Sequence, residues 1–306
     1  MILTFGTTPA LARSMTFDRL RIGEVNRTKD VRVAAAGKAT NAARVVATLG
    51  ERVVTTVAAG GLTGEQMLAD LRAAGIETLV QPVESPTRVC VTVIDSAGGT
   101  TELIQDADPL TPAEVGGLLA LAAPHYAHCR AVLCLGSLAP GVPADVYAQV
   151  VRAARAANPA CLLVVDAHGL PLHLAAAEPG VIVKCNADEL RATFSPRGGS
   201  VAGIAHDLVA AGARGVLVTD GARPTTACDA DGATTIDTPR VKVVSPIGSG
   251  DSVAAGLAVG LVRGMPFRAA ARLGVACGAA NAMTPIAGSV DPAEVERLFE
   301  TLEMAR

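Results

Sequence analysis

The residues best suited to chemistry lie in one short run, Gly248-Ser249-Gly250-Asp251, which precedes an apolar segment with a helical pattern. Gly248 and Gly250 leave the main chain unobstructed, so backbone N–H groups at the start of the helix can converge on an anion, with the positive end of the helix dipole behind them. A carboxylate beside such a site repels phosphate. We therefore expect Asp251 to have a second task, taking a proton from a hydroxyl group that attacks the bound phosphate.

A purely structural interpretation of this run is helix capping, since an Asp at a helix N-terminus stabilises the helix by about 1 kcal/mol without any catalysis. Two familiar nucleotide-binding patterns are excluded. The dinucleotide fingerprint needs a third glycine where this chain has Val253, and the Walker A pattern fails because Ala39 follows Gly37-Lys38. A phosphate site in this chain must therefore be of another type.

Two further motifs precede a helix or follow a buried strand, where ligands of α/β proteins are usually met. Gly37, Lys38 and Asn41 lie in a small-residue turn before the first long helix, and this turn could equally be a simple loop and cap. Ser137 follows the apolar run 131–135. Together these residues offer one cation, one amide and one hydroxyl to a ligand.

Asn186 and Glu189 follow another apolar run, 181–184. Their three-residue spacing is typical of a capping box, in which each side chain binds the other residue's backbone N–H group. The same amide and carboxylate could equally hold the waters of a magnesium ion on nucleotide phosphates.

The elements that would position these motifs alternate from about residue 40 onward, with apolar strand-like runs followed by helical patterns. Strands are expected at 53–57, 131–135, 161–165, 181–184, 215–219 and 241–244, and helices at 41–50, 62–74, 144–157, 201–211, 266–283 and 292–303. This alternation predicts an α/β fold with a doubly wound, mainly parallel sheet covered by helices on both faces, in a single domain over residues 1–306.

Residues 12–33 and 77–105 break the alternation with polar, β-like segments, among them 88–94 and 100–104 joined by a turn at 95–99. They predict a small second sheet. Its natural place is as a lid over the carboxyl ends of the main strands, where open α/β sheets bind ligands.

Composition excludes several classes of function. The net charge of −3 and the isoelectric point near 6.0 argue against nucleic acid or an anionic membrane as partner. The longest apolar stretch, 253–262, is too short to span a bilayer. The seven cysteines form no CxxC pair, which indicates buried thiols in a reducing compartment, and residues 1–5 predict a first strand and no signal peptide. We expect a cytoplasmic protein.

In order and spacing these motifs resemble the PfkB, or ribokinase-like, carbohydrate kinases, most nearly the branch of 1-phosphofructokinase and tagatose-6-phosphate kinase. The similarity covers nearly the whole chain, from residues 1–4 to 291–292. It rests on 23–27, Gly37-Lys38, 41–44, 136–138, Asn186-Ala187-Asp188-Glu189-Leu190, Gly248-Ser249-Gly250-Asp251-Ser252 and 279–282.

The resemblance implies a kinase that uses ATP and Mg²⁺ to phosphorylate a hydroxyl of a sugar phosphate, and a homodimer paired through the lid sheets. Asp251 would be the base, and the backbone N–H groups of Gly248, Ser249 and Gly250 would hold the developing charge. The nucleotide would be bound by Asn186, Glu189, Thr219, Gly221, Gly278 and Asn281, with Glu189 reaching Mg²⁺ through water. The acceptor would be bound by Gly37, Lys38, Asn41, Arg88 and Ser137, with Arg27 as a further lid residue.

The acceptor is less defined, because Ala12 stands where the family usually carries an acid that grips sugar hydroxyls, and the substrate loop also departs at Ala36 and at 39–40. Ser245 stands where ribokinases carry an acid, which argues against a monovalent-cation site. Two alternatives remain: a kinase of an unphosphorylated sugar or nucleoside, and a catalytically weak sugar or nucleotide sensor. Arg88 and Lys38 favour a phosphorylated acceptor, since such a ligand needs local cations, and an intact Asp251 argues against a sensor.

Overall fold

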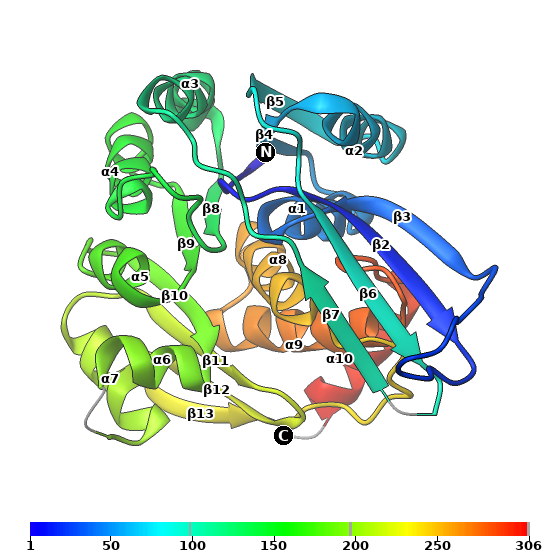
Figure 1. Cartoon of the computed structure of the whole chain (residues 1–306). Helices are drawn as coiled ribbons and strands as arrows, with labels where there is room; N and C mark the ends of the chain where they lie inside the picture. Colours follow the sequence, from blue (N-terminus) through cyan, green and yellow to red (C-terminus); the bar gives the residue numbers. More distant parts are fainter. Residues whose placement is uncertain (98, 196–197, 305–306) are drawn as a thin grey trace.

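The computed structural model describes residues 1–97, 99–195 and 198–304, and in that part of the chain the main body is a nine-stranded sheet (Figure 1). Its strand order is β13-β12-β11-β10-β9-β8-β1-β4-β5. The strands from β5 to β11 run parallel, and β12 and β13 add an antiparallel edge. The bounds are β1 (Ile2–Phe5), β4 (Val53–Ala59), β5 (Glu77–Pro82), β8 (Ala131–Leu135), β9 (Leu162–Asp166), β10 (Val181–Asn186), β11 (Gly215–Asp220), β12 (Arg223–Asp229) and β13 (Gly232–Ile236).

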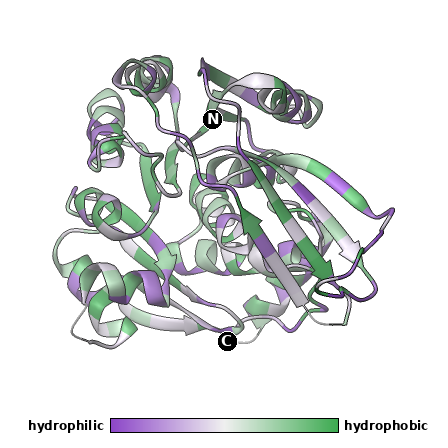
Figure 2. Cartoon of the chain, in the orientation of Figure 1, coloured by the Kyte–Doolittle hydropathy of each residue, from purple (hydrophilic) through white to green (hydrophobic). Residues whose placement is uncertain are grey.

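Helices cover both faces of this sheet, which confirms the predicted fold class. One core lies under α1 (Lys38–Thr48), α2 (Gly61–Ala73), α8 (Ser249–Val262), α9 (Phe267–Ala282) and α10 (Pro292–Met304). The other lies under α3 (Pro112–Ala122), the 3₁₀ helix η1 (Ala123–His128), α4 (Val146–Ala157), α5 (Gly169–Ala176), α6 (Ala187–Phe194) and α7 (Val201–Ala210). Figure 2 shows the central strands and α8 largely in the colour of hydrophobic residues, as expected of elements buried on all sides.

The helix α8 carries the predicted anion-binding turn at its start, and its depth in the fold depends on glycine. A Cβ atom on Gly256 would lie 2.9 Å from the Cα atom of Gly274 in α9, so the two helices approach more closely than larger residues allow. At the start of α8, a Cβ atom on Gly278 of α9 would lie 3.1 Å from the carbonyl oxygen of Ser249, so close packing against α9 holds this end in place as well.

The second sheet has four strands in the described residues, in the order β3 (Val31–Ala36), β2 (Ala10–Phe17), β6 (Val89–Asp95) and β7 (Gly99–Ile104). The central pair β2 and β6 is parallel, and both outer pairs are antiparallel. Figure 1 shows this small sheet beside the large one, on the right of the view. The strands of the two predicted segments thus come together although some 50 residues separate β3 from β6 in the chain.

Several predicted elements differ from the observed ones. The sequence pattern groups residues 77–82 with the small sheet, but they form β5, which pairs with β4 at the edge of the large sheet. The strand predicted at 241–244 is wrong: this segment is irregular, Val243 is 59% exposed, and the Val244 N–H donates to the carbonyl of Ala282 at the end of α9. The hairpin of β12 and β13 and the helix α3 were not predicted, and the predicted turn at 95–99 includes residue 98, which lies outside the described residues.

All seven cysteines are buried and form no disulfide, as the sequence predicts. Among the helices of the described residues, none combines the length and the apolar character needed to cross a bilayer.

Candidate active site

The predicted anion-binding turn requires glycine at position 248. Gly248 adopts the left-handed conformation (φ 82°, ψ −3°), and a Cβ atom there would lie 2.7 Å from the backbone nitrogen of Gly288. The helix α8 begins at the next residue. Its first N–H groups have no intrahelical acceptor, but Ser249 N–H donates to the carbonyl of Pro246 (3.2 Å), so Gly250 is the better donor for an anion.

Asn281 holds this turn from behind. Its Nδ2 donates to the carbonyl of Ile247 (2.8 Å) and to Ser249 Oγ (3.2 Å), while its Oδ1 accepts from the N–H of Gly288 (2.7 Å). Asn281 is fully buried and, unlike the other predicted nucleotide residues, does not line the cleft. The contacts of the Asn281 side chain are those of a support for the turn.

Asp251 is the predicted base, and this residue is only 6% exposed. Burial raises its pKa from 3.8 to about 6, although the ammonium group of Lys38 and the hydrogen bond from Asn41 act in the opposite direction. The Nδ2 of Asn41, from α1, donates to Asp251 Oδ2 at 2.7 Å. The group is therefore ionised near neutral pH yet basic enough to accept a proton, which is the property a general base requires.

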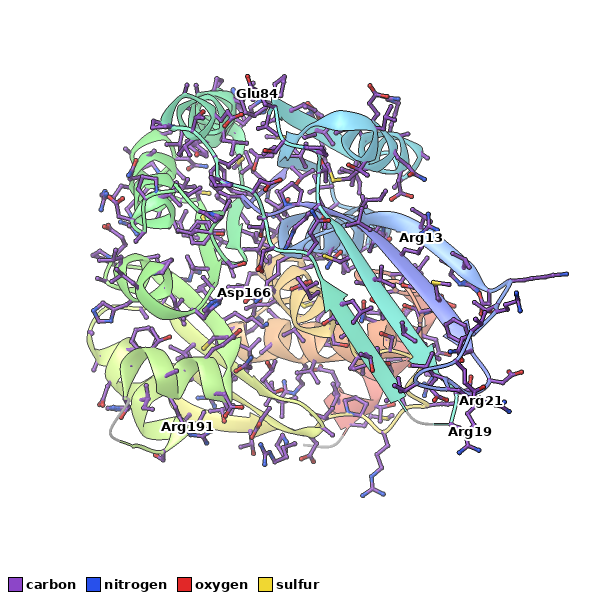
Figure 3. All side chains as sticks on the ribbon, viewed as in Figure 1. Arg13, Arg19, Arg21, Glu84, Asp166 and Arg191 are labelled. Carbon is purple, nitrogen blue, oxygen red and sulfur yellow. The ribbon has the colours of Figure 1, made fainter. Side chains whose placement is uncertain are left out.

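A buried ion cluster adjoins Asp251. Asp166, fully buried at the end of β9 (Figure 3), accepts from Lys38 Nζ (2.9 Å) and from Lys184 Nζ (2.7 Å). Burial alone would raise the pKa of Asp166, but the two ammonium groups outweigh it and hold the pKa below its usual value. For Lys38, burial would lower the pKa, and the carboxylates of Asp166, Asp251 and Glu189 raise it instead.

Lys184 reaches the turn itself. A Cβ atom on Gly250 would lie 2.8 Å from Lys184 Nζ, so glycine at this position leaves room for the ammonium group beside the turn. Neither Asp166 nor Lys184 was predicted as a site residue. A signal was present: each is the charged residue near the carboxyl end of an otherwise apolar run, 162–166 and 181–186, where a charge is costly unless it is paired.

One cleft of about 920 Å³ connects the small sheet, Asp251 and the ends of β10 and β11. It is lined by every predicted site residue except Asn281 and Arg27, namely Gly37, Lys38, Asn41, Arg88, Ser137, Asn186, Glu189, Thr219, Gly221, Gly248, Ser249, Gly250, Asp251 and Gly278. Arg27 is exposed and does not line it. The cleft thus brings together residues from both sheets around one buried carboxylate.

Basic side chains outnumber acidic ones among the residues that line the cleft, in a chain of net charge −3. Of the described residues that line it, five are Lys or Arg and three are Asp or Glu. They are Arg32, Lys38, Arg88, Lys184 and Arg240 against Glu102, Glu189 and Asp251. Such a balance favours anionic ligands.

Asn186 and Glu189 form the predicted capping box: Asn186 Oδ1 accepts from Glu189 N–H (2.8 Å), and Glu189 Oε2 accepts from Asn186 N–H (2.9 Å). The capping role does not use the whole carboxylate. Glu189 Oε1 lies 3.9 Å from Lys38 Nζ, at the cleft. The two interpretations of this motif are therefore compatible.

Arg88 uses much of its guanidinium group within the protein. Its N–H groups donate to the carbonyls of Pro9 (3.3 Å), Thr8 (2.9 Å) and Gln105 (3.1 Å). Arg88 thereby braces the loop at the start of β2 against the end of β7. Together with the pairing of Lys38 to Asp166, this weakens the sequence argument that these two cations await an acceptor's phosphate.

Comparison with known proteins agrees with this geometry. The family model described as pfkB family carbohydrate kinase matches residues 2–293. Phosphofructokinase-2 from Escherichia coli, solved with potassium, is similar with a TM-score of 0.87 and 23% identity over 99% of both chains. Other structures of that protein include a complex with fructose-6-phosphate and a tetrameric inhibited form.

Two further structures have the same fold. A possible 1-phosphofructokinase from Thermotoga maritima gives a TM-score of 0.88 at 20% identity, and a carbohydrate kinase from Agrobacterium tumefaciens gives 0.76 at 21% identity, each over 98% of this chain and 97% of the other. At such identities the structures demonstrate a shared fold, whereas the family model covers nearly the whole chain. The protein therefore belongs to the pfkB family of carbohydrate kinases and is an ATP-dependent sugar kinase.

Proposed function

We propose that this kinase transfers the γ-phosphoryl group of ATP to a hydroxyl group of a sugar phosphate. The observation that carries the proposal is Asp251, buried beside the anion-binding turn with a pKa of about 6. The hydroxyl gives its proton to this carboxylate while its oxygen bonds to the γ-phosphorus, and the bond from phosphorus to the β-phosphate oxygen breaks to release ADP.

The surrounding groups support this step through charge and position. The backbone N–H groups of Gly248 and Gly250 serve as the anion hole, with a smaller part for Ser249, whose N–H is already engaged. Lys184 and Lys38 bring positive charge to the same point, where a loose phosphoryl-transfer transition state gathers negative charge. Thr219, Gly221 and Gly278 belong to the nucleotide half of the cleft in this proposal.

A divalent metal fits this donor set only together with the nucleotide. Within residues 1–97, 99–195 and 198–304 no group of three or more His, Cys, Asp or Glu side chains could hold a metal ion. Mg²⁺ keeps several waters and is usually bound through one or two carboxylates plus substrate phosphates. Glu189, with Asn186 beside it, supplies that limited share, and the metal would neutralise phosphate charge.

The support for an acceptor that carries its own phosphate is that basic side chains outnumber acidic ones among the residues that line the cleft. A coupled assay of ADP release tests the proposal with fructose 1-phosphate, fructose 6-phosphate and tagatose 6-phosphate beside the free sugars and nucleosides. Turnover of at least one phosphorylated acceptor, at higher kcat/KM than its unphosphorylated counterpart, is the expected result. Exclusive turnover of unphosphorylated acceptors would overturn it.

A kinase of an unphosphorylated sugar or nucleoside is the second candidate, because Arg88 and Lys38 are already engaged by Thr8, Pro9 and Asp166. The same panel distinguishes the two. A sensor without turnover is disfavoured by the buried base.

We also propose a homodimer built through the small sheets. Val31 on the edge strand β3 is 39% exposed and Leu103 on the other edge strand β7 is 58% exposed. Both edges would leave unpaired backbone groups and apolar side chains in water unless a second copy covers them.

A further inference from the structure

The side chains on the face of the small sheet that lines the cleft form rows across the strands, because residues in register on neighbouring strands share a face. One row crosses the sheet from β3 to β7 as Ala34, Ala12, Cys90 and Ile104. All four residues line the cleft. This row, hereafter the apolar row, offers a ligand no side-chain oxygen or nitrogen.

The next row along the same face is of opposite character. It crosses the sheet as Arg32, Ser14, Thr92 and Glu102, and these residues also line the cleft. The sheet therefore presents polar side chains to the cleft one row further along its strands. Polar side chains are therefore missing from the apolar row only, and not from the whole face of the small sheet.

A ligand hydroxyl that faces the apolar row would lose water without gaining a partner. Ala34 and Cys90 are buried, and burial raises the pKa of the Cys90 thiol, which stays neutral. Ile104, at the end of the edge strand β7, is 52% exposed, and a hydrocarbon group of the ligand would cover it. An unpartnered hydroxyl here would weaken binding roughly 10- to 100-fold.

A second observation locates the polar end of the ligand. The Oδ1 atom of Asn41 is buried and, within the described part of the chain, accepts no hydrogen bond, although Asn41 lines the cleft. Its other terminal atom, Nδ2, is bound to Asp251. A donor from the ligand, close to the hydroxyl that Asp251 deprotonates, would satisfy Oδ1.

We infer that the acceptor is a deoxygenated sugar phosphate: it carries a hydroxyl donor for Asn41 near the attacking hydroxyl, and it presents a carbon without a hydroxyl to the apolar row. The inference rests on the proposed function for the placement of the acceptor. It goes beyond that function by stating which part of the acceptor is hydrocarbon.

The test compares two ketohexose phosphates, fructose 1-phosphate and tagatose 6-phosphate, each with its 3-deoxy and 4-deoxy analogues. Binding is measured by calorimetry on the full chain, so that the result does not depend on turnover, and ADP release is measured separately. We expect at least one deoxy analogue to bind about 10- to 100-fold more tightly than its parent.

Two variants supply a hydrogen-bonding group to the apolar row, Ala12→Asp and Ile104→Asn. The second lies at a half-exposed position and serves if the first does not fold. Either should reduce or reverse the preference for the deoxy analogue. Arg13→Asp is the matched control, since Arg13 lies next to Ala12 on the outer face of β2 (Figure 3) and should retain the preference.

Tighter binding of both parent sugars than of every analogue, or no binding of any of the six compounds, would overturn the inference. So would an unchanged preference in a folded variant. Tighter binding of a deoxy analogue without ADP release would uphold the apolar row and contradict the proposed phosphoryl transfer, so the two failures are distinguishable.

Discussion

Replacing Asp251 by Asn should make the protein more stable and nearly inactive. The pKa of Asp251 rises from 3.8 to about 6 on folding, and each pKa unit corresponds to about 1.36 kcal/mol, so the ionised carboxylate costs about 3 kcal/mol of stability. Because the folded pKa is the higher one, this cost is absent below pH 3.8, grows up to about pH 6 and is constant above it. A neutral amide in place of the carboxylate would carry no such cost.

The variant's gain in stability should therefore depend on pH. Urea unfolding at about pH 8 should give a free energy of unfolding up to about 3 kcal/mol above that of the wild type, and the difference should fall below about 1 kcal/mol near pH 4. The gain of about 3 kcal/mol is an upper value, since the amide of the new Asn must still form hydrogen bonds beside Asn41. A purely capping Asp would show a small loss of stability and no such pH dependence.

Activity should change in the opposite sense. Loss of a general base lowers kcat roughly 10²- to 10⁴-fold. In the wild type, kcat/KM should rise with pH through about 6 as Asp251 ionises, and the variant should lack this limb. Its affinity for ATP should be equal or slightly higher, because a negative charge beside the phosphates has been removed.

The assays are ADP release and nucleotide calorimetry on the same preparation. The control is Asp188→Asn, which makes the same exchange in the first turn of α6 at an exposed position, where the carboxylate lies 3.4 Å from the guanidinium group of Arg191. Near-native kcat in the Asp251→Asn variant, with unchanged ATP affinity, would refute the catalytic assignment. The turn at 248–251 would then be an anion site without a base.

Further predictions concern the ion cluster, the support of the turn and the assembly. Asp166→Asn should lower the free energy of unfolding by about 3–5 kcal/mol, because it leaves two ammonium groups without their buried partner, and adding Lys184→Met should recover part of that loss in the same denaturation assay. Asn281→Leu should destabilise by about 1–3 kcal/mol and lower kcat through a displaced turn; an unchanged kcat in a destabilised variant would contradict the positioning role. Lys38 has a higher pKa in the folded protein than in the unfolded chain, so its ion pairs should stabilise the protein fully below about pH 10.5. This stabilisation should be lost as the pH rises toward the folded pKa, and the Lys38→Met variant should not show that alkaline loss. Light scattering should give about twice the chain mass of 30.8 kDa, Leu103→Asp should shift it toward one chain mass, and a wild-type monomer would contradict the dimer.

The sequence alone determined the class of fold and most of the cleft. Runs such as 131–135 and 181–184 are apolar almost throughout and short, so local composition suffices to identify them as strands buried on both faces. The turn before α8 was likewise readable, because glycine is the residue that readily tolerates the left-handed conformation of Gly248. The sequence did not predict elements whose conformation depends on their neighbours in space. Strand β5 lies at the edge of the large sheet, and residues 241–244 have an apolar sequence but no strand to pair with in the described residues.

Only the tertiary structure decided how charges are shared. Asp166, Lys184 and Lys38 come from β9, β10 and α1, and no spacing along the chain reveals that they form one buried cluster. Nor does the sequence reveal that Arg88 is occupied by backbone carbonyls or that Asn281 lies behind the turn. The physical reason is that periodicity is a local property, whereas hydrogen bonding and desolvation depend on atoms that are adjacent in space and distant in sequence.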